Sequence, residues 1–193
     1  MCNIIESKMV ARLSKTLAIE CGICSSNARR IGVAAFFHDA GKVFVARSIL
    51  QKPGPLSPLE KEQVKFHTIY GARMLKIIPG ELGKIAQNMA YWHHERFDSG
   101  GYWNKFTSEL PPYISLITLA DVFVALVSER EYKRSWPVSE ALDYIADKSG
   151  SHFDPKLVKL FVSLVKNDTD IQTFLPAGHF SGAKGGASLA GRC

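Results

Sequence analysis

The sequence lacks both a stretch able to span a membrane and a leader of the secretory kind. Its most apolar run, residues 114–127, is shorter than the ~20 residues that cross a bilayer, and it carries Asp121. A secretory leader joins a basic start, an apolar middle and a small-residue cleavage site, and the first residues show no such pattern. We therefore expect a cytoplasmic protein with no membrane partner.

Cysteine is scarce, and its spacing does not suit a structural metal site. The four cysteines are Cys2, Cys21, Cys24 and Cys193, and one pair has the CxxC spacing. A structural zinc needs a second pair, and a reducing compartment disfavours disulfides. The segment 21–24 is either a redox or metal motif or a helix end broken at Gly22, and we favour the helix end.

Strand patterns and internal repeats are absent as well. Apolar residues instead recur at helical spacing, as Ile5, Met9, Leu13 and Leu17 do. Caps, prolines and glycines divide the chain into seven predicted helices, at about 5–17, 25–39, 57–79, 81–96, 111–129, 137–148 and 155–166. We predict an all-α protein consisting of a single helical bundle.

The chain divides into one predicted domain and a tail. Residues 1–175 form the domain, and with 46% hydrophobic residues the sequence can bury a core. Residues 176–193 contain five glycines and no acid, which indicates a flexible tail or a remnant of an expression fusion.

The charge balance is basic. A net charge of +6 and a pI of about 9.2 suit an anionic partner such as a nucleotide. An ordinary solvated basic surface explains the same balance, so charge alone does not decide between them.

Side chains that bind metals occur at four places in the predicted helices. They are His38-Asp39, His67, His93-His94 and Asp121. Asp121 interrupts an apolar helix, where a carboxylate is costly unless it is paired or bound to a cation. Neighbours on a helix point about 100° apart, so either each pair supplies one ligand to each of two metals or an aspartate bridges them. Taken singly, each residue also fits a buried histidine or an acid satisfied by an ion pair.

These residues lie in segments that resemble a known family. His38-Asp39-Ala40-Gly41-Lys42 resembles the HD-[x]-GK motif of HD-domain metal phosphohydrolases. HHERFDSGGYW, residues 93–103, resembles the HHExxDGxGYP signature of the HD-GYP subfamily. Residues 48–75 and 119–134 are similar to two further blocks of that family. The resemblance implies an HD-type helical bundle that hydrolyses cyclic di-GMP at a centre of two or three metals.

The resemblance also implies the metal-binding and catalytic residues. The metal ligands would be His38, Asp39, His67, His93, His94 and Asp121. Asp39 would bridge the ions, and Lys42 would contact the scissile phosphate or protonate the leaving oxygen. Glu6 stands where many members have a metal-binding histidine, and is either a ligand of a third ion or a residue that faces solvent.

Other positions that match the family would bind substrate. Arg130 and Lys133 would join Lys42 in holding phosphate, and Gly101 and Tyr102 would shape the mouth of the pocket. Glu95-Arg96 is expected to form a local ion pair or to support the ligands.

We expect a metal-dependent phosphodiesterase that converts cyclic di-GMP to pGpG, with or without a further step to GMP, by metal-activated hydroxide. Mixed histidine and carboxylate ligation suits Fe, Mn, Zn or Ni and does not choose among them. We expect two or three divalent ions, with Fe or Mn ahead of Zn or Ni. One alternative function is hydrolysis of another cyclic dinucleotide or nucleotide. Another is a catalytically degenerate nucleotide-binding module, since Trp103 replaces the family's proline and Val124 an aspartate. Expected partners are the cyclic dinucleotide, an N-terminal receiver or sensor module, a GGDEF-type protein and a second copy, but no duplex nucleic acid.

Overall fold

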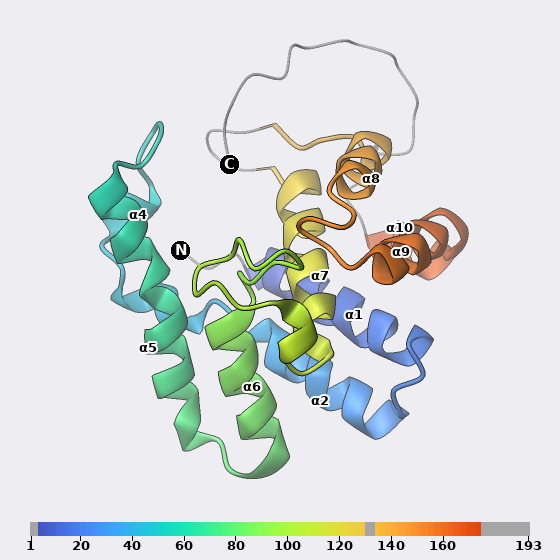
Figure 1. Cartoon of the computed structure of the whole chain (residues 1–193), viewed down its shortest axis with the longest axis horizontal. Coiled ribbons are helices and arrows are strands. Elements are labelled where there is room, and N and C mark those ends of the chain that lie inside the picture. The colour runs from blue at the N-terminus through green and yellow to red at the C-terminus, as the bar shows by residue number, and fades with distance from the viewer. Residues whose placement is uncertain (1–3, 130–133, 175–193) are drawn as a thin grey trace.

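The computed structural model describes residues 4–129 and 134–174, and of residues 169, 170 and 174 only the backbone. In these ranges it has ten α-helices, three 3-10 helices and no strand beyond isolated bridges (Figure 1). The α-helices are α1 Ile4–Glu20, α2 Ser25–Phe36, α3 Arg47–Leu50, α4 Pro58–Lys65, α5 His67–Met74, α6 Gly80–Trp92, α7 Tyr113–Val127, α8 Val138–Asp147, α9 Pro155–Asn167 and α10 Thr169–Phe174. The 3-10 helices are η1 Ala40–Phe44, η2 Leu75–Ile77 and η3 Thr107–Glu109. The predicted all-α class is confirmed.

None of the helices in the described ranges has the length and apolarity needed to span a bilayer. Two of the predicted substrate-binding residues, Arg130 and Lys133, lie outside the described residues, as does the predicted tail 176–193.

The predicted helices all occur within the described residues, and three of the differences from prediction bear on the site. The helix predicted at 25–39 ends at Phe36, and the one predicted at 81–96 ends at Trp92. The helix predicted at 57–79 is divided at Phe66 into α4 and α5. At this break His67 Nδ1 bonds the carbonyl of Val64 and Thr68 Oγ1 donates to that of Lys65, at 2.6 and 3.0 Å. Side-chain donors therefore satisfy carbonyls that a continuous helix would bond through its backbone.

The caps explain where several helices begin and end. Ser57 caps the start of α4, as the sequence predicts, and it forms a reciprocal capping box with Glu60. At the start of α2 the N-cap is Cys24, with no side-chain cap bond, whereas Ser25 or Ser26 is the choice that sequence favours. Gly22, with φ +81°, follows the end of α1, so the helix-end interpretation of the CxxC segment is confirmed.

The core lies where α1, α2, α6 and α7 meet. α1 packs along α2 and α7, α2 packs against α6, and α5 packs against α6 and η1 (Figure 1). Leu13, Leu17, Met89 and Ile117 are fully buried in this core. Phe123 of α7 is also fully buried, and its ring packs on Phe161 of α9. Burial of each such side chain contributes about 1.5–3 kcal/mol. The core fixes the ends of α2 and α6 and the middle of α7 relative to one another.

Gly41 allows η1 to lie directly against α5. A Cβ atom at this position would overlap the carbonyl of His67 and the amide nitrogen of Gly71. Only glycine therefore permits this approach, which brings Asp39, the residue before η1, alongside the first turn of α5. The fold therefore requires a glycine at this position of the HD-[x]-GK motif, independently of any role in catalysis.

Candidate metal centre

The six predicted ligands meet at one place. His38 and Asp39 follow α2, His67 begins α5, His93 and His94 follow α6, and Asp121 lies within α7. Ligand atoms of one group, Asp39, His67, His93 and His94, lie within 4.8 Å of one another. Ligand atoms of a second group, His38, His93 and Asp121, meet the same limit. The two groups share His93, so the centre has the layout of two adjoining sites.

Asp39 lies at the middle of this cluster. Its Oδ1 is 3.3 Å from His67 Nε2 and 3.6 Å from His93 Nε2. Its Oδ2 is 3.3 Å from His38 Nε2 and 2.5 Å from Lys42 Nζ. The two carboxylate oxygens thus face different neighbours, which is the geometry that a carboxylate needs to bridge two cations.

Backbone carbonyls set the orientation of three imidazole rings. Nδ1 of His38, His67 and His93 lies 2.7, 2.6 and 2.9 Å from the carbonyl oxygens of Ala35, Val64 and Met89. A carbonyl only accepts, so each Nδ1 carries the proton and each neutral ring presents an Nε2 lone pair. This is how proteins orient metal-binding histidines.

The donor set fits divalent cations. His67 Nε2 and His93 Nε2 are 3.3 Å apart, and two lone pairs at that distance repel unless a cation lies beside them. His38 Nε2 and Asp39 Oδ1 are buried and have no hydrogen-bond partner among the described residues. Buried polar atoms without a partner are costly, and a bound cation would satisfy both.

Electrostatics favours the protonation states that metal binding needs at His93, His94 and Asp39, but opposes the neutral form of His38. Burial lowers the pKa of His93 and, well below its usual value, that of His94. Burial opposes ionisation of Asp39, yet Lys42 and His38 hold its pKa well below the usual value. Burial alone would lower the pKa of His38, but the carboxylates of Asp39 and Asp121 raise it well above the ordinary value. With no metal bound, a proton on His38 would balance this negative charge, so metal and proton compete there.

A cavity of about 770 Å³ opens beside the cluster. Tyr102 forms part of its wall, and the Tyr102 ring centroid is 4.4 Å from that of His94. Gly101 also lines it, and a Cβ there would overlap the backbone of residues 94–96. The predicted pocket residues Gly101 and Tyr102 are therefore adjacent to the cluster, and Lys42 contacts it through Asp39.

Glu6 is not brought into either group of ligand atoms within the described residues. It lies in the first turn of α1 and is partly buried. Its role as a ligand of a third ion stays a prediction.

Glu95 has a role that the sequence does not reveal. Its buried carboxylate accepts hydrogen bonds from the backbone N–H groups of Trp103 and Lys105, both at 2.7 Å. The local ion pair expected with Arg96 does not form, since Arg96 pairs with Asp98 instead. Glu95 thus fixes the loop that carries Gly101 and Tyr102. The sequence offers one indication of this role, an acid that lies between the two histidines and the glycine pair.

The two departures from the family pattern have clear structural roles. Trp103 stacks on Tyr91, with ring centroids 5.5 Å apart, and its Nε1 lies 3.3 Å from the hydroxyl of Thr68. Lys65 Nζ lies 4.5 Å from the centre of the same indole ring. Val124 is buried in the apolar core. Trp103 therefore anchors the loop onto α5 and α6, and Val124 serves packing.

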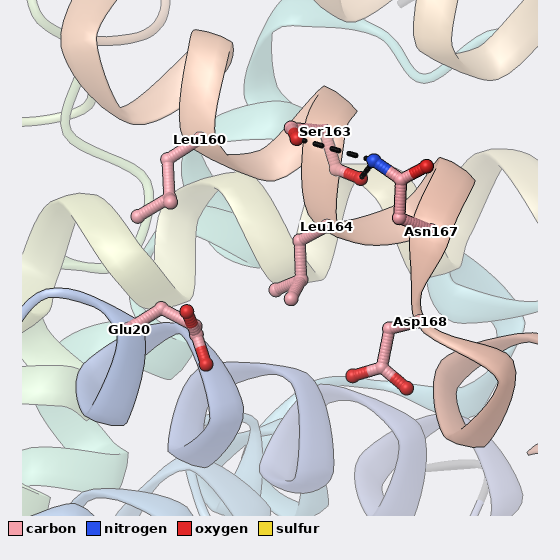
Figure 2. A pocket seen from close by; sticks show the side chains of 6 residues that line it. All are labelled: Glu20, Leu160, Ser163, Leu164, Asn167 and Asp168. Carbon is pink, nitrogen blue, oxygen red and sulfur yellow. Dashed lines mark hydrogen bonds between the residues drawn. The ribbon is translucent and has the colours of Figure 1, made fainter.

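A second, smaller hollow lies elsewhere. It has a volume of about 230 Å³ and lies between the end of α1 and α9 (Figure 2). Its lining residues are Glu20, Leu160, Ser163, Leu164, Asn167 and Asp168. It contains no histidine, and Asn167 bonds within its own helix to the carbonyl of Ser163. The cavity beside the histidine–aspartate cluster is the candidate active site.

The fold and the cluster define an all-α domain built around a group of histidine and aspartate side chains that could hold metal ions. A family model described as HD domain matches residues 3–157. The chain belongs to the HD-domain family, and its motifs place it in the HD-GYP group.

Similar proteins agree with this assignment. A cyclic di-GMP phosphodiesterase of Thermotoga maritima is 36% identical over 86% of this chain and 45% of its own length. A 3′3′-cGAMP-specific phosphodiesterase 2 of Vibrio cholerae is 36% identical over 86% of this chain and 32% of its own. The HDG"Y"P protein Bd1817 of Bdellovibrio bacteriovorus has the same fold, with a TM-score of 0.68 at 20% identity, over 86% of this chain and 53% of that one. The chain thus spans less than half the length of these two curated relatives.

Proposed function

We propose that this chain is a metal-dependent phosphodiesterase that hydrolyses cyclic di-GMP to pGpG, with or without a further step to GMP. The observation that supports this most is the convergence of Asp39 and three imidazole Nε2 atoms beside a cavity large enough for a nucleotide ligand. Relatives named for cyclic di-GMP support the substrate.

The six clustered residues would hold two divalent ions, with Fe or Mn favoured over Zn or Ni. Asp39, His67, His93 and His94 would hold one ion, and His38, His93 and Asp121 the other, while Asp39 faces both. When bound, such ions activate water for attack and neutralise charge on the phosphate oxygens. Glu6 would be a further ligand only if a third ion binds.

Lys42 would act on the phosphate itself. Its ammonium lies on Asp39 Oδ2 at the edge of the cluster, and its side chain is 30% exposed. A phosphate oxygen can therefore approach Lys42 without displacing a core residue. The ammonium would orient the scissile phosphate and donate a proton to the leaving alkoxide, which leaves as an alcohol. Arg130 and Lys133 would contact phosphate as well.

A second candidate is hydrolysis of 3′3′-cGAMP, because relatives named for that substrate are as similar as those named for cyclic di-GMP. For the cell, we propose a cytoplasmic location and regulation through a receiver, sensor or GGDEF-type partner, or through dimer formation.

The test is turnover by protein loaded with Mn²⁺ or, without oxygen, Fe²⁺. Cyclic di-GMP, 3′3′-cGAMP, cyclic di-AMP and pGpG are supplied separately and the products separated by chromatography. We expect pGpG from cyclic di-GMP, and loss of both bound metal and turnover in His93→Ala and Asp121→Ala. Bound metal without turnover of any of the four would refute the enzyme and leave a binding module.

A further inference from the structure

The 770 Å³ cavity has a polar wall on α4, which includes Lys61, Glu62 and Lys65. Its lining includes the loop 52–56, residues of α4, and Gly101, Tyr102 and Asn104. With the scissile phosphate at the cluster beside Tyr102, this cavity has room for a base of the cyclic dinucleotide. Side chains on the α4 wall are therefore the ones that would contact and distinguish a base of the ligand.

Two side chains of α4 offer complementary chemistry on this wall. Glu62 and Lys65 are three residues apart on one helix face, and their charged atoms are 3.9 Å apart. Both residues line the cavity, and at 3.9 Å their ion pair is loose. The Glu62 side chain is 62% exposed, whereas that of Lys65 is 22% exposed and its ammonium also lies 4.5 Å from the centre of the Trp103 ring. Lys52, by contrast, is held by both oxygens of Glu60 at 2.9 and 2.7 Å.

Glu62 lies in the wall of the same 770 Å³ cavity as Tyr102. The Tyr102 ring also adjoins His94, with ring centroids 4.4 Å apart. Aromatic side chains of this kind are surfaces on which bases stack.

Guanine and adenine present opposite patterns to such a pair. The Watson–Crick edge of guanine has the N1–H and N2–H₂ donors beside the O6 acceptor. A carboxylate accepts from the two donors, and an ammonium donates to O6. Adenine has an N6–H₂ donor in place of O6 and a lone pair on N1, so both contacts become unfavourable.

We propose that Glu62 and Lys65 form a guanine-recognising subsite that makes a guanine-containing cyclic dinucleotide the preferred ligand over cyclic di-AMP. The inference rests on the proposed function for its ligand class, and it adds the residues that set base specificity. Glu62 accepts hydrogen bonds from the guanine edge, and Lys65 donates to O6.

The test is the ratio of kcat/KM for cyclic di-GMP to that for cyclic di-AMP, measured with wild type and Glu62→Gln. Glutamine can donate as well as accept, so it tolerates adenine. We expect the ratio to fall about tenfold. Glu81→Gln is the matched control, because Glu81 also pairs with a lysine three residues along, at 2.8 Å, but does not line the cavity. Circular dichroism and melting temperature check that both variants are folded.

Equilibrium binding of the two radiolabelled dinucleotides to EDTA-treated protein separates this inference from the proposed function. The subsite lies outside the cluster, so the preference for guanine should persist without metal and should weaken in Glu62→Gln. Turnover of cyclic di-GMP with an unchanged ratio in Glu62→Gln would overturn the subsite and leave the enzyme standing. Selective binding that depends on Glu62, without turnover in metal-loaded protein, would support the subsite and refute the hydrolase. Absence of any guanine preference in wild type would overturn the subsite.

Discussion

His67 Nε2 and His93 Nε2 lie 3.3 Å apart, while the Nδ1 atoms of both rings are engaged by backbone carbonyls. Both rings are buried, and neither can rotate without losing its carbonyl contact. The protein therefore holds two lone pairs together in a place that water does not reach. A cation that binds there relieves repulsion that the fold imposes, so metal binding should stabilise the folded chain.

We predict that divalent metal raises the melting temperature and that His93→Ala removes the increase. Metal at about 100 times its Kd stabilises a folded protein by about 2.7 kcal/mol. For a chain of this size this is a rise of roughly 5–10 °C. The measurement is thermal unfolding with Mn²⁺ and with EDTA, together with metal analysis of purified protein.

The control is His152→Gln, which changes a histidine outside both ligand groups and should keep the increase. An increase in His93→Ala equal to that of wild type would rule out His93 as a ligand.

The identities of the clustered residues could be predicted from the sequence, but their exact geometry could not. Two adjacent side chains cannot both face one site from the middle of a helix, yet the sequence predicts His38-Asp39 and His93-His94 within helices. In the structure α2 ends at Phe36 and α6 at Trp92, so both pairs lie beyond regular helix. No proline or helix-ending glycine marks either end, and contacts with distant segments decide it.

The break at Phe66 has the same kind of cause. Local sequence favours one helix from Ser57 onward, yet His67 and Thr68 direct side-chain atoms at the last carbonyls of α4. The contacts of Glu95 with the loop at Trp103 and of Trp103 with α5 also join segments that have no local signal of proximity. The sequence predicts which residues bind metal, because metal binding requires histidine and carboxylate. It does not predict which segments these residues contact, because packing of the whole chain decides that.

Lys42→Met should slow turnover while leaving metal content unchanged. The Lys42 ammonium contacts Asp39 Oδ2 but is not needed to orient any imidazole ring. Loss of a positioned proton donor costs about 100-fold or more in kcat. Steady-state kinetics and metal analysis on the same preparation check this. Arg47→Met is the control, because Arg47 is an exposed cation on the neighbouring α3 that bonds to Gln51. A Lys42→Met enzyme with wild-type kcat would exclude the proton-donor role.

Glu95→Ala should loosen the loop that carries Tyr102. The substitution leaves two backbone N–H groups without their acceptor, and each costs about 1–3 kcal/mol where water cannot replace it. Hydrogen exchange at the Trp103 and Lys105 amides should become at least tenfold faster, while amides of α1 change little.

Glu109→Ala is the matched control, because that carboxylate is exposed and its contact with Lys105 is a 3.7 Å ion pair between side chains. Unchanged exchange at both amides in Glu95→Ala would show that the two hydrogen bonds to the Glu95 carboxylate do not stabilise the loop. Glu95→Gln, which keeps one carbonyl oxygen, should fall between the two.

His152 should make stability depend on pH between about 6.5 and 4. Burial is the main cause that lowers its pKa to about 4, with Arg96 adding to the effect. The ring stacks on Phe153, and the backbone carbonyl of His152 accepts from Phe97 N at 3.0 Å. A histidine whose folded pKa is depressed stabilises the protein fully above the unfolded pKa of about 6.5. As pH falls from 6.5 to 4, the unfolded chain binds the proton first and stability decreases, then levels off below 4.

Partial exposure reduces the size of this effect, which we put at about 2 kcal/mol after solvent screening. The measurement is urea unfolding of wild type and His152→Gln at saturating metal, from pH 7 to pH 4. Other titrating groups contribute equally to both proteins, so the difference in unfolding free energy isolates His152. We expect wild type to lose stability relative to His152→Gln as pH falls through this window. A difference that stays constant with pH would mean that His152 titrates alike in the folded and unfolded chain.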